Sequence, residues 1–313
     1  LNEVKSLINN PLHNLAFGGY MEAKGFKASG ISEGVYVNTD FRAWRLESEK
    51  LLKNCSIRIK LHTAQTPDIA AWKSGLEKPV VSDRKENKKW WADFWNRSFI
   101  HIASDNDGKA KEIARNYQLF RYMLGCNAYG DYPTKFNGGL FTYDPQYTDT
   151  LYRFTPDFRK WGGGTHTAQN QRLVYFPMLR SGDFDMMRSQ FDFYNRLLPA
   201  AELRSKVYWG HEGACFTEQI ENFGLPKGME YNAWLEYQWD TALEFCYMIL
   251  EHEQYTGGDI KEYLPLIEST LRFFNEHYQY LARQRGRKVF DEQDKLVLYP
   301  GSACETYKMA YNA

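Results

Sequence analysis

The order of helical and non-helical segments after residue 90 constrains the fold most strongly. Apolar residues recur at helical spacing in one segment after another, and long polar, aromatic connections join them without an intervening strand pattern. Helices are predicted around Trp90 to Trp95 and at about 107–126, 167–179, 184–198, 231–255 and 260–282. This order favours an α/α arrangement over a parallel-sheet fold.

The first part of the chain predicts β-structure instead. Ile57 to His62 alternates apolar and polar residues, and Val35 to Val37 is a second short strand candidate. Because these strands are too few for a stable sandwich, we expect the end of a β-domain that begins upstream. Residues 1–80 would then hold that β-domain and a linker, and residues 81–313 the N-terminal portion of a helical domain. Both chain ends are expected to lie within a longer protein.

Composition narrows the class of partner. The 39 basic and 39 acidic residues cancel, and no Lys/Arg-rich block is present, which argues against nucleic acid or an anionic membrane surface. No apolar run approaches the roughly 18 residues of a membrane span. The 9 Trp, 22 Tyr and 20 Phe fit a protein that stacks rings on sugar faces, although a large aromatic core explains them equally well. We expect a neutral partner.

No metal or other cofactor is predicted. The five cysteines are widely spaced, odd in number and free of Cys-x-x-Cys pairs. His211-Glu212 begins like the metalloprotease motif His-Glu-x-x-His, but Cys215 occupies the position of the second His. A zinc peptidase is therefore excluded.

Two segments carry candidate site residues. Three glycines follow Trp161, and a helix would then place His166 and Asn170 together at positions i and i+4. The alternative is a glycine turn before an amphipathic helix whose His and Asn bind nearby backbone. Near the end, Glu305 follows a loop of small residues, where shielding would raise a carboxyl pKa as a general acid requires. The alternative is a Glu that caps a helix.

Six motifs occur in order along the second part of the chain. They are Trp91-Ala92-Asp93-Phe94-Trp95-Asn96-Arg97-Ser98, Tyr117-Gln118-Leu119-Phe120-Arg121-Tyr122-Met123-Leu124, Asn137-Gly138-Gly139-Leu140-Phe141, Trp161 to Pro177, Tyr255-Thr256-Gly257-Gly258-Asp259 and Pro300 to Glu305. In this order the chain resembles glycoside hydrolase family 95, the inverting α-L-fucosidases and α-L-galactosidases, and their relatives in large secreted bacterial proteins. The resemblance covers about Trp90 to Tyr307.

The resemblance implies a mainly α protein with an (α/α)6 barrel after an N-terminal β-domain and a sugar bound in the barrel mouth. In the family's polar motif a His precedes two Asn residues that position the attacking water. His166 matches the His and Asn170 the second Asn, whereas Ala168 replaces the first. Glu305 matches the general acid, and the family's remaining catalytic Asp would lie beyond Ala313.

An inverting glycosidase needs a protonated carboxyl at the leaving oxygen and an activated water on the opposite face of the sugar. Glu305 is predicted to supply the first. Asn170 would supply the second, with Glu212 or Glu218 as the base. The remaining substrate-binding candidates are His166, His211, Trp161 and Trp209, where each Trp is also explained as a core residue.

The resemblance thus implies a secreted or periplasmic bacterial glycoside hydrolase that releases a terminal fucose- or galactose-like sugar from a neutral glycan. A catalytically silent carbohydrate-binding relative is the main alternative, because Ala168 cannot hydrogen-bond a water. A polysaccharide lyase is disfavoured, since lyases typically need a cationic groove and no basic cluster is present.

Overall fold

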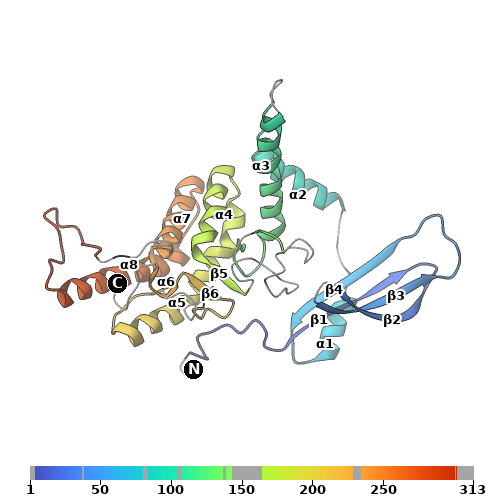
Figure 1. Cartoon of the computed structure of the whole chain (residues 1–313), viewed down its shortest axis with the longest axis horizontal. Coiled ribbons are helices and arrows are strands. Elements are labelled where there is room, and N and C mark those ends of the chain that lie inside the picture. Colours follow the sequence, from blue (N-terminus) through green and yellow to red (C-terminus); the bar gives the residue numbers. More distant parts are fainter. Residues whose placement is uncertain are drawn as a thin grey trace. The chain divides into compact units, whose positions relative to one another are not determined.

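The computed structural model describes residues 4–36, 39–79, 84–103, 108–136, 139–142, 164–227, 234–299 and 301 (Figure 1). Trp161 and Glu305 lie outside the described residues. The chain divides into two compact units. Unit 1 comprises Leu1–Asn9, Lys88–Phe141 and Arg159–Ala313, and unit 2 comprises Asn10–Asn87 and Thr142–Phe158.

Unit 2 is built from two antiparallel strand pairs and one helix. Strand β1 (Leu15–Ala23) pairs with β4 (Ile57–Gln65), and β2 (Phe26–Tyr36) pairs with β3 (Thr39–Ser48). Helix α1 (Ile69–Glu77) follows β4 and begins where Asp68 Oδ1 accepts the Ala70 N–H at 2.8 Å. The strand predicted at Ile57 to His62 is confirmed as part of β4.

One face of the β1–β4 pair carries apolar side chains that stay exposed. Phe17, Ile59 and Leu61 are 78 %, 64 % and 76 % exposed. On the opposite face, the Trp72 ring of α1 packs against Gly18, where a Cβ would approach it to 3.1 Å. Each strand pair is a two-stranded sheet in the described part of the chain, so its outer edges carry unpaired backbone groups.

Unit 1 is mostly helical. Its α-helices are α2 (Arg84–Arg97, which begins just before the unit boundary), α3 (Gly108–Asn127), α4 (Ala168–Ser181), α5 (Arg188–Trp209), α6 (Trp234–Tyr237), α7 (Asp240–Thr256) and α8 (Leu264–Gln284). Short 3-10 turns, Phe184–Met187 and Lys261–Tyr263, precede α5 and α8. Strands β5 (Thr165–Thr167) and β6 (Gln219–Glu221) pair antiparallel. The helices predicted around Trp90 to Trp95 and at 107–126, 167–179 and 260–282 are confirmed within a few residues.

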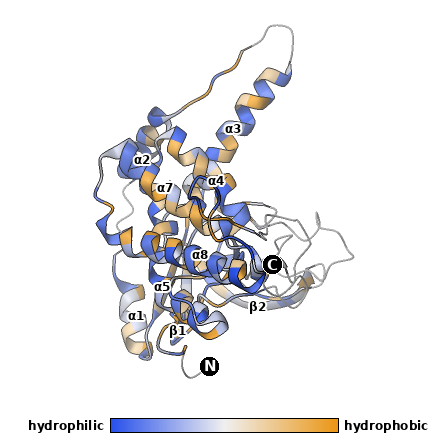
Figure 2. Ribbon diagram, turned by 90° about the vertical axis from the view of Figure 1, so that its left-hand side faces the viewer, coloured by the Kyte–Doolittle hydropathy of each residue, from blue (hydrophilic) through white to orange (hydrophobic). Residues whose placement is uncertain are grey.

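The core of unit 1 lies between α4, α5, α7 and α8. Buried Val174, Met178, Phe193 and Ile249 belong to one apolar cluster. Figure 2 shows hydrophobic and hydrophilic residues alternating along α8, whose apolar side is the one that is buried. The core of unit 1 is therefore formed by the buried faces of these helices.

A buried ion pair ties α3 to the turn after α4. Arg121 Nη2 donates to Asp183 Oδ1 at 2.8 Å and to Oδ2 at 2.9 Å, and both side chains are at most 2 % exposed. The Arg121 guanidinium also lies 4.2 Å from the Phe94 ring centroid of α2. One cation thus connects three segments that are far apart in the sequence.

The predicted (α/α)6-barrel-type fold was wrong. Across the described ranges, eight α-helices of unequal length, from 4 residues in α6 to 22 in α5, combine with antiparallel strand pairs and do not form a clear (α/α)6 barrel. Helical periodicity marks where helices occur, but it does not determine how they are ordered in space. It also missed β5 and β6, because three-residue strands are too short to show alternation. Of the helices that are described, none is long and apolar enough to cross a bilayer.

Candidate functional site

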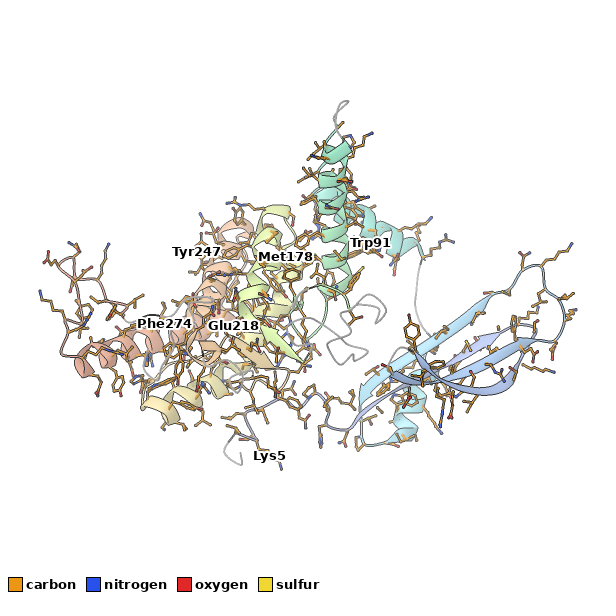
Figure 3. The ribbon with its side chains drawn as sticks, viewed as in Figure 1. Lys5, Trp91, Met178, Glu218, Tyr247 and Phe274 are labelled. Atoms are coloured by element: carbon orange, nitrogen blue, oxygen red, sulfur yellow. The ribbon has the colours of Figure 1, made fainter. Side chains whose placement is uncertain are left out.

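Strand pairing brings Glu218 to the first turn of α4. In the β5–β6 pair His166 lies opposite Ile220, so the residue before β6 meets the residue after β5. The Ala168 N–H donates to the Glu218 carbonyl oxygen at 2.8 Å, and the Gln169 N–H donates to Glu218 Oε1 at 3.0 Å. Figure 3 shows Glu218 among the helices of unit 1. We call Glu218, His166, Asn170, Arg172 and Asp240 the Glu218 site.

Glu218 is a buried carboxyl with one unsatisfied oxygen. The residue is 0 % exposed, and its Oε2 has no hydrogen-bond partner among the described residues. Burial raises the pKa of Glu218 to about 7, although the Gln169 N–H and Arg172 oppose this shift. At neutral pH the carboxyl therefore exists in both protonation states, as proton transfer requires.

The charged groups that act on Glu218 are a second carboxyl, that of Asp240, and the Arg172 guanidinium. Asp240, the first residue of α7, has its pKa raised by burial and by Glu244. Arg172 of α4 donates to Glu244 Oε1 at 2.9 Å and lowers the pKa of both Glu218 and Asp240. The α4–α7 contact therefore brings together two carboxyls, those of Glu218 and Asp240, whose pKa values are both raised by burial, as is often found at functional sites.

His166 is held neutral in an aromatic environment. Its Nε2 lies 2.8 Å from Asn222 Oδ1, which makes Nε2 the donor and Nδ1 an acceptor. The Tyr132 ring stacks on the imidazole at a centroid distance of 5.9 Å. Burial, assisted by the charge of Lys135, lowers the pKa of His166 to about 3. His166 Nδ1 is buried and has no hydrogen-bond partner in the described ranges.

Asn170 is the third residue of α4 and is 9 % exposed. Ala168, which begins α4, is 2 % exposed. Both residues lie next to Gln169, whose N–H binds Glu218. His166 and Asn170 thus flank the backbone that Glu218 contacts, and Glu218 is the residue that the sequence offered only as a fallback base.

Trp209 and His211 belong to a second cluster, around His277 of α8. Ring centroids lie 5.0 Å apart for Trp209 and His277 and 5.4 Å apart for His211 and His277. Both ring nitrogens of His277, His211 Nε2 and Trp209 Nε1 are buried without a partner in the part of the chain that the structure describes. Burial lowers the pKa of His277 to about 3.

Glu212 lies at the surface. Its side chain is 73 % exposed and pairs with Arg272 at 3.2 Å, while its N–H donates to Glu276 Oε2 at 2.8 Å. The adjacent Gly213 packs against α8 with φ +91°, and a Cβ there would lie 2.2 Å from the Phe273 nitrogen. An exposed, ion-paired Glu212 is a weaker base candidate than Glu218.

Sequence reasoning missed Asp240, Asn222 and His277. Asp240 stands at the start of a predicted helix, where an acidic residue is explained by its favourable interaction with the helix dipole. That explanation hid its role as a candidate site residue. Nothing local marks His277, whose ring neighbours Trp209 and Trp239 come from other segments. No cluster of three or more His, Cys, Asp or Glu residues suited to a metal occurs among the described residues.

A pocket of about 210 Å³ lies beside the segment that precedes Glu218. Its walls are mainly apolar and include Leu197, Val207, Phe216 and Ile220, with Arg204 as a charged member. Glu218 is not part of its lining. The pocket therefore offers apolar space near the Glu218 site but does not expose the carboxyl.

Comparison with known proteins gives one result. Residues 1–100 match the N-terminal part of a domain of unknown function, DUF5703. This match spans less than a third of the chain and ends before the Glu218 site begins. No curated protein sequence matches the chain.

Proposed function

We propose that this protein is a glycoside hydrolase that releases a terminal sugar with inversion, in which Glu218 is the base that activates water. The observation that carries the proposal is the buried Glu218 carboxyl with its unsatisfied Oε2 at the start of α4. A pKa near 7 suits a base that works at neutral pH. Glu305 is kept as the proposed general acid on the strength of its sequence motif.

Each neighbouring group has a proposed role. Asn170 would orient the water beside Glu218, and neutral His166 would accept a hydrogen bond from a sugar hydroxyl at Nδ1. Arg172 would limit the rise in the Glu218 pKa and keep enough carboxylate present. The fucose- or galactose-like substrate, the secreted or periplasmic location and the role of Glu305 rest on the family resemblance.

The test compares three variants on a panel of aryl glycosides and neutral glycans. Glu218→Gln and Glu305→Gln should each lower kcat at least about a hundredfold, because each removes a proton-transfer group. Glu212→Gln is the matched control, since Glu212 is exposed and ion-paired, and it should keep native kcat. Proton NMR of the first product should show the anomer opposite to that of the substrate. A native rate in Glu218→Gln would refute the assignment of Glu218 as the base, and a native rate in Glu305→Gln would refute that of Glu305 as the acid.

A catalytically silent carbohydrate-binding protein is the second candidate, favoured by Ala168. This buried alanine stands where the related motif places a water-binding Asn. A silent protein would bind a neutral glycan saturably without releasing sugar, and Glu218→Gln would leave that binding unchanged. Any turnover that depends on Glu218 excludes it.

A further inference from the structure

A groove of about 410 Å³ lies between α4 and α7, and we propose that it binds an uncharged oligosaccharide without hydrolysing it. We call it the Tyr247 groove. Its lining residues are Phe176, Pro177, Leu179 and Arg180 of α4 and Tyr247, Glu251 and Tyr255 of α7. Figure 3 shows Tyr247 on α7 at a different level from Glu218. Neither Glu218 nor another member of the Glu218 site lines the groove.

Exposed aromatic rings form one wall of the groove. Tyr247 and Tyr255 are 52 % and 43 % exposed. They stand eight residues apart with Glu251 between them, so all three share one face of α7 and span about 12 Å along it. The Phe176 ring of α4 lies 6.5 Å from the Tyr247 ring and is tilted against it by 48°. This length suits a short oligosaccharide better than a single sugar ring.

The polar groups of the groove suit hydroxyl groups. Arg180 lies over the Tyr255 ring at 5.7 Å from its centroid, and the nearby Glu251 carboxylate raises the pKa of the Tyr247 hydroxyl. Arg180 contributes donors, Glu251 acceptors, and the tyrosine hydroxyls both. Because one cation and one anion cancel, the groove does not favour a charged ligand.

The same charges disfavour an apolar protein partner. A helix or strand packed into the groove would remove Arg180 and Glu251 from water, which costs several kcal/mol per ion without a compensating partner. A polyol replaces the lost water contacts with its own hydroxyl groups, and its ring faces can pack on Tyr247 and on the exposed part of Tyr255. An uncharged oligosaccharide can therefore pack on the aromatic rings of the groove and hydrogen-bond to its charged groups, which an apolar protein segment cannot do.

The test is retention of the whole protein in native affinity gels that contain a neutral polysaccharide, with arabinogalactan, xyloglucan and galactomannan as probes. Tyr247→Ala combined with Tyr255→Ala should weaken retention about tenfold on the polysaccharide that retains the native protein. Leu250→Ala is the matched control, because Leu250 lies on α7, is 44 % exposed and does not line the groove. It should be retained like the native protein.

The measurement is made in the Glu218→Gln background, which separates this groove from the Glu218 site. Retention that depends on Tyr247 in that background supports the groove even if no glycan is hydrolysed. The inference is overturned if the double tyrosine variant, with native circular dichroism, is retained as strongly as the Leu250→Ala control. It is equally overturned if none of the three polysaccharides retains the native protein. Retention only by gels that contain charged polygalacturonate, or binding only to other proteins, also overturns it.

Discussion

Glu218→Gln should inactivate the proposed enzyme and, above neutral pH, stabilise it. Gln has the shape of Glu and can still accept the Gln169 N–H. Its amide NH2 would stand at the Oε2 position and, like the Oε2 of Glu218, would lack a hydrogen-bond partner among the described residues. The two side chains differ mainly because only Glu can carry a charge into this buried place.

The size of the effect follows from the pKa. The Glu218 pKa rises from 4.5 to about 7 on folding, so between these values the folded chain binds more protons than the unfolded chain. The contribution of Glu218 to native stability is therefore most favourable below pH 4.5 and falls as the pH rises to about 7. The full loss is about 3 kcal/mol and remains at higher pH. Relative to the native protein, Glu218→Gln should gain about this amount between pH 4 and pH 8.

Urea unfolding followed by tryptophan fluorescence measures this difference at pH 4, 6 and 8. Plotting the difference between variant and native free energies cancels the contribution of titrating groups that do not interact with Glu218, whereas Asp240 stays coupled to it. Leu250→Ala, which changes a part-exposed residue of α7 that cannot titrate, is the control, and its difference from the native protein should not vary with pH. If the Glu218→Gln difference stays flat across the range, the carboxyl does not carry a raised pKa, and the assignment of Glu218 as a base loses its support.

Three other variants test the packing around the site. The pKa of His277 falls from 6.5 to about 3 on folding, so its contribution to native stability is lost as the pH drops below 6.5. Relative to the native protein, His277→Phe should therefore gain about 2 kcal/mol in urea unfolding at pH 5. Arg121→Met should cost about 3 to 5 kcal/mol in thermal unfolding at pH 7, because Asp183 keeps a buried charge without its main partner. Gly213→Ala should lower Tm sharply or abolish soluble expression, since its Cβ would collide with the α8 backbone, while Gly108→Ala has open space and should match the native Tm.

Periodic patterns in the sequence located most of the long helices and strand β4, but they missed β1, β3, β5, β6 and α1 and did not give the arrangement of the elements. Alternation from Ile57 predicted β4, and apolar spacing predicted α3, α4 and α8. These patterns record which side of an element is buried, which is a local property. The barrel prediction required the spatial order of the helices, which depends on long-range pairings such as β5 with β6.

The residues of the candidate site also fall into those that local sequence indicated and those that only tertiary packing reveals. His166 and Asn170 were found because glycines and polar residues stand close together before a helix. Glu218 was only a reserve candidate, since its burial arises from α4 and α7 rather than from its own neighbours. His277 gave no signal at all, because its unsatisfied nitrogens follow from contacts with Trp209, 68 residues earlier. Burial of a polar group is a tertiary property, so the sequence could not rank these residues.

The unpaired edges of the β1–β4 and β2–β3 ribbons have a consequence for amide hydrogen exchange. Backbone amides along an open edge exchange with solvent through small local openings, whereas those in a packed helix need a larger cooperative opening. Amides of α8 around Phe273, which is 0 % exposed, should therefore exchange orders of magnitude more slowly than the outer amides of β3. A molecule that adds a strand to such an edge would slow the amide exchange of the edge strand of this protein with which it pairs.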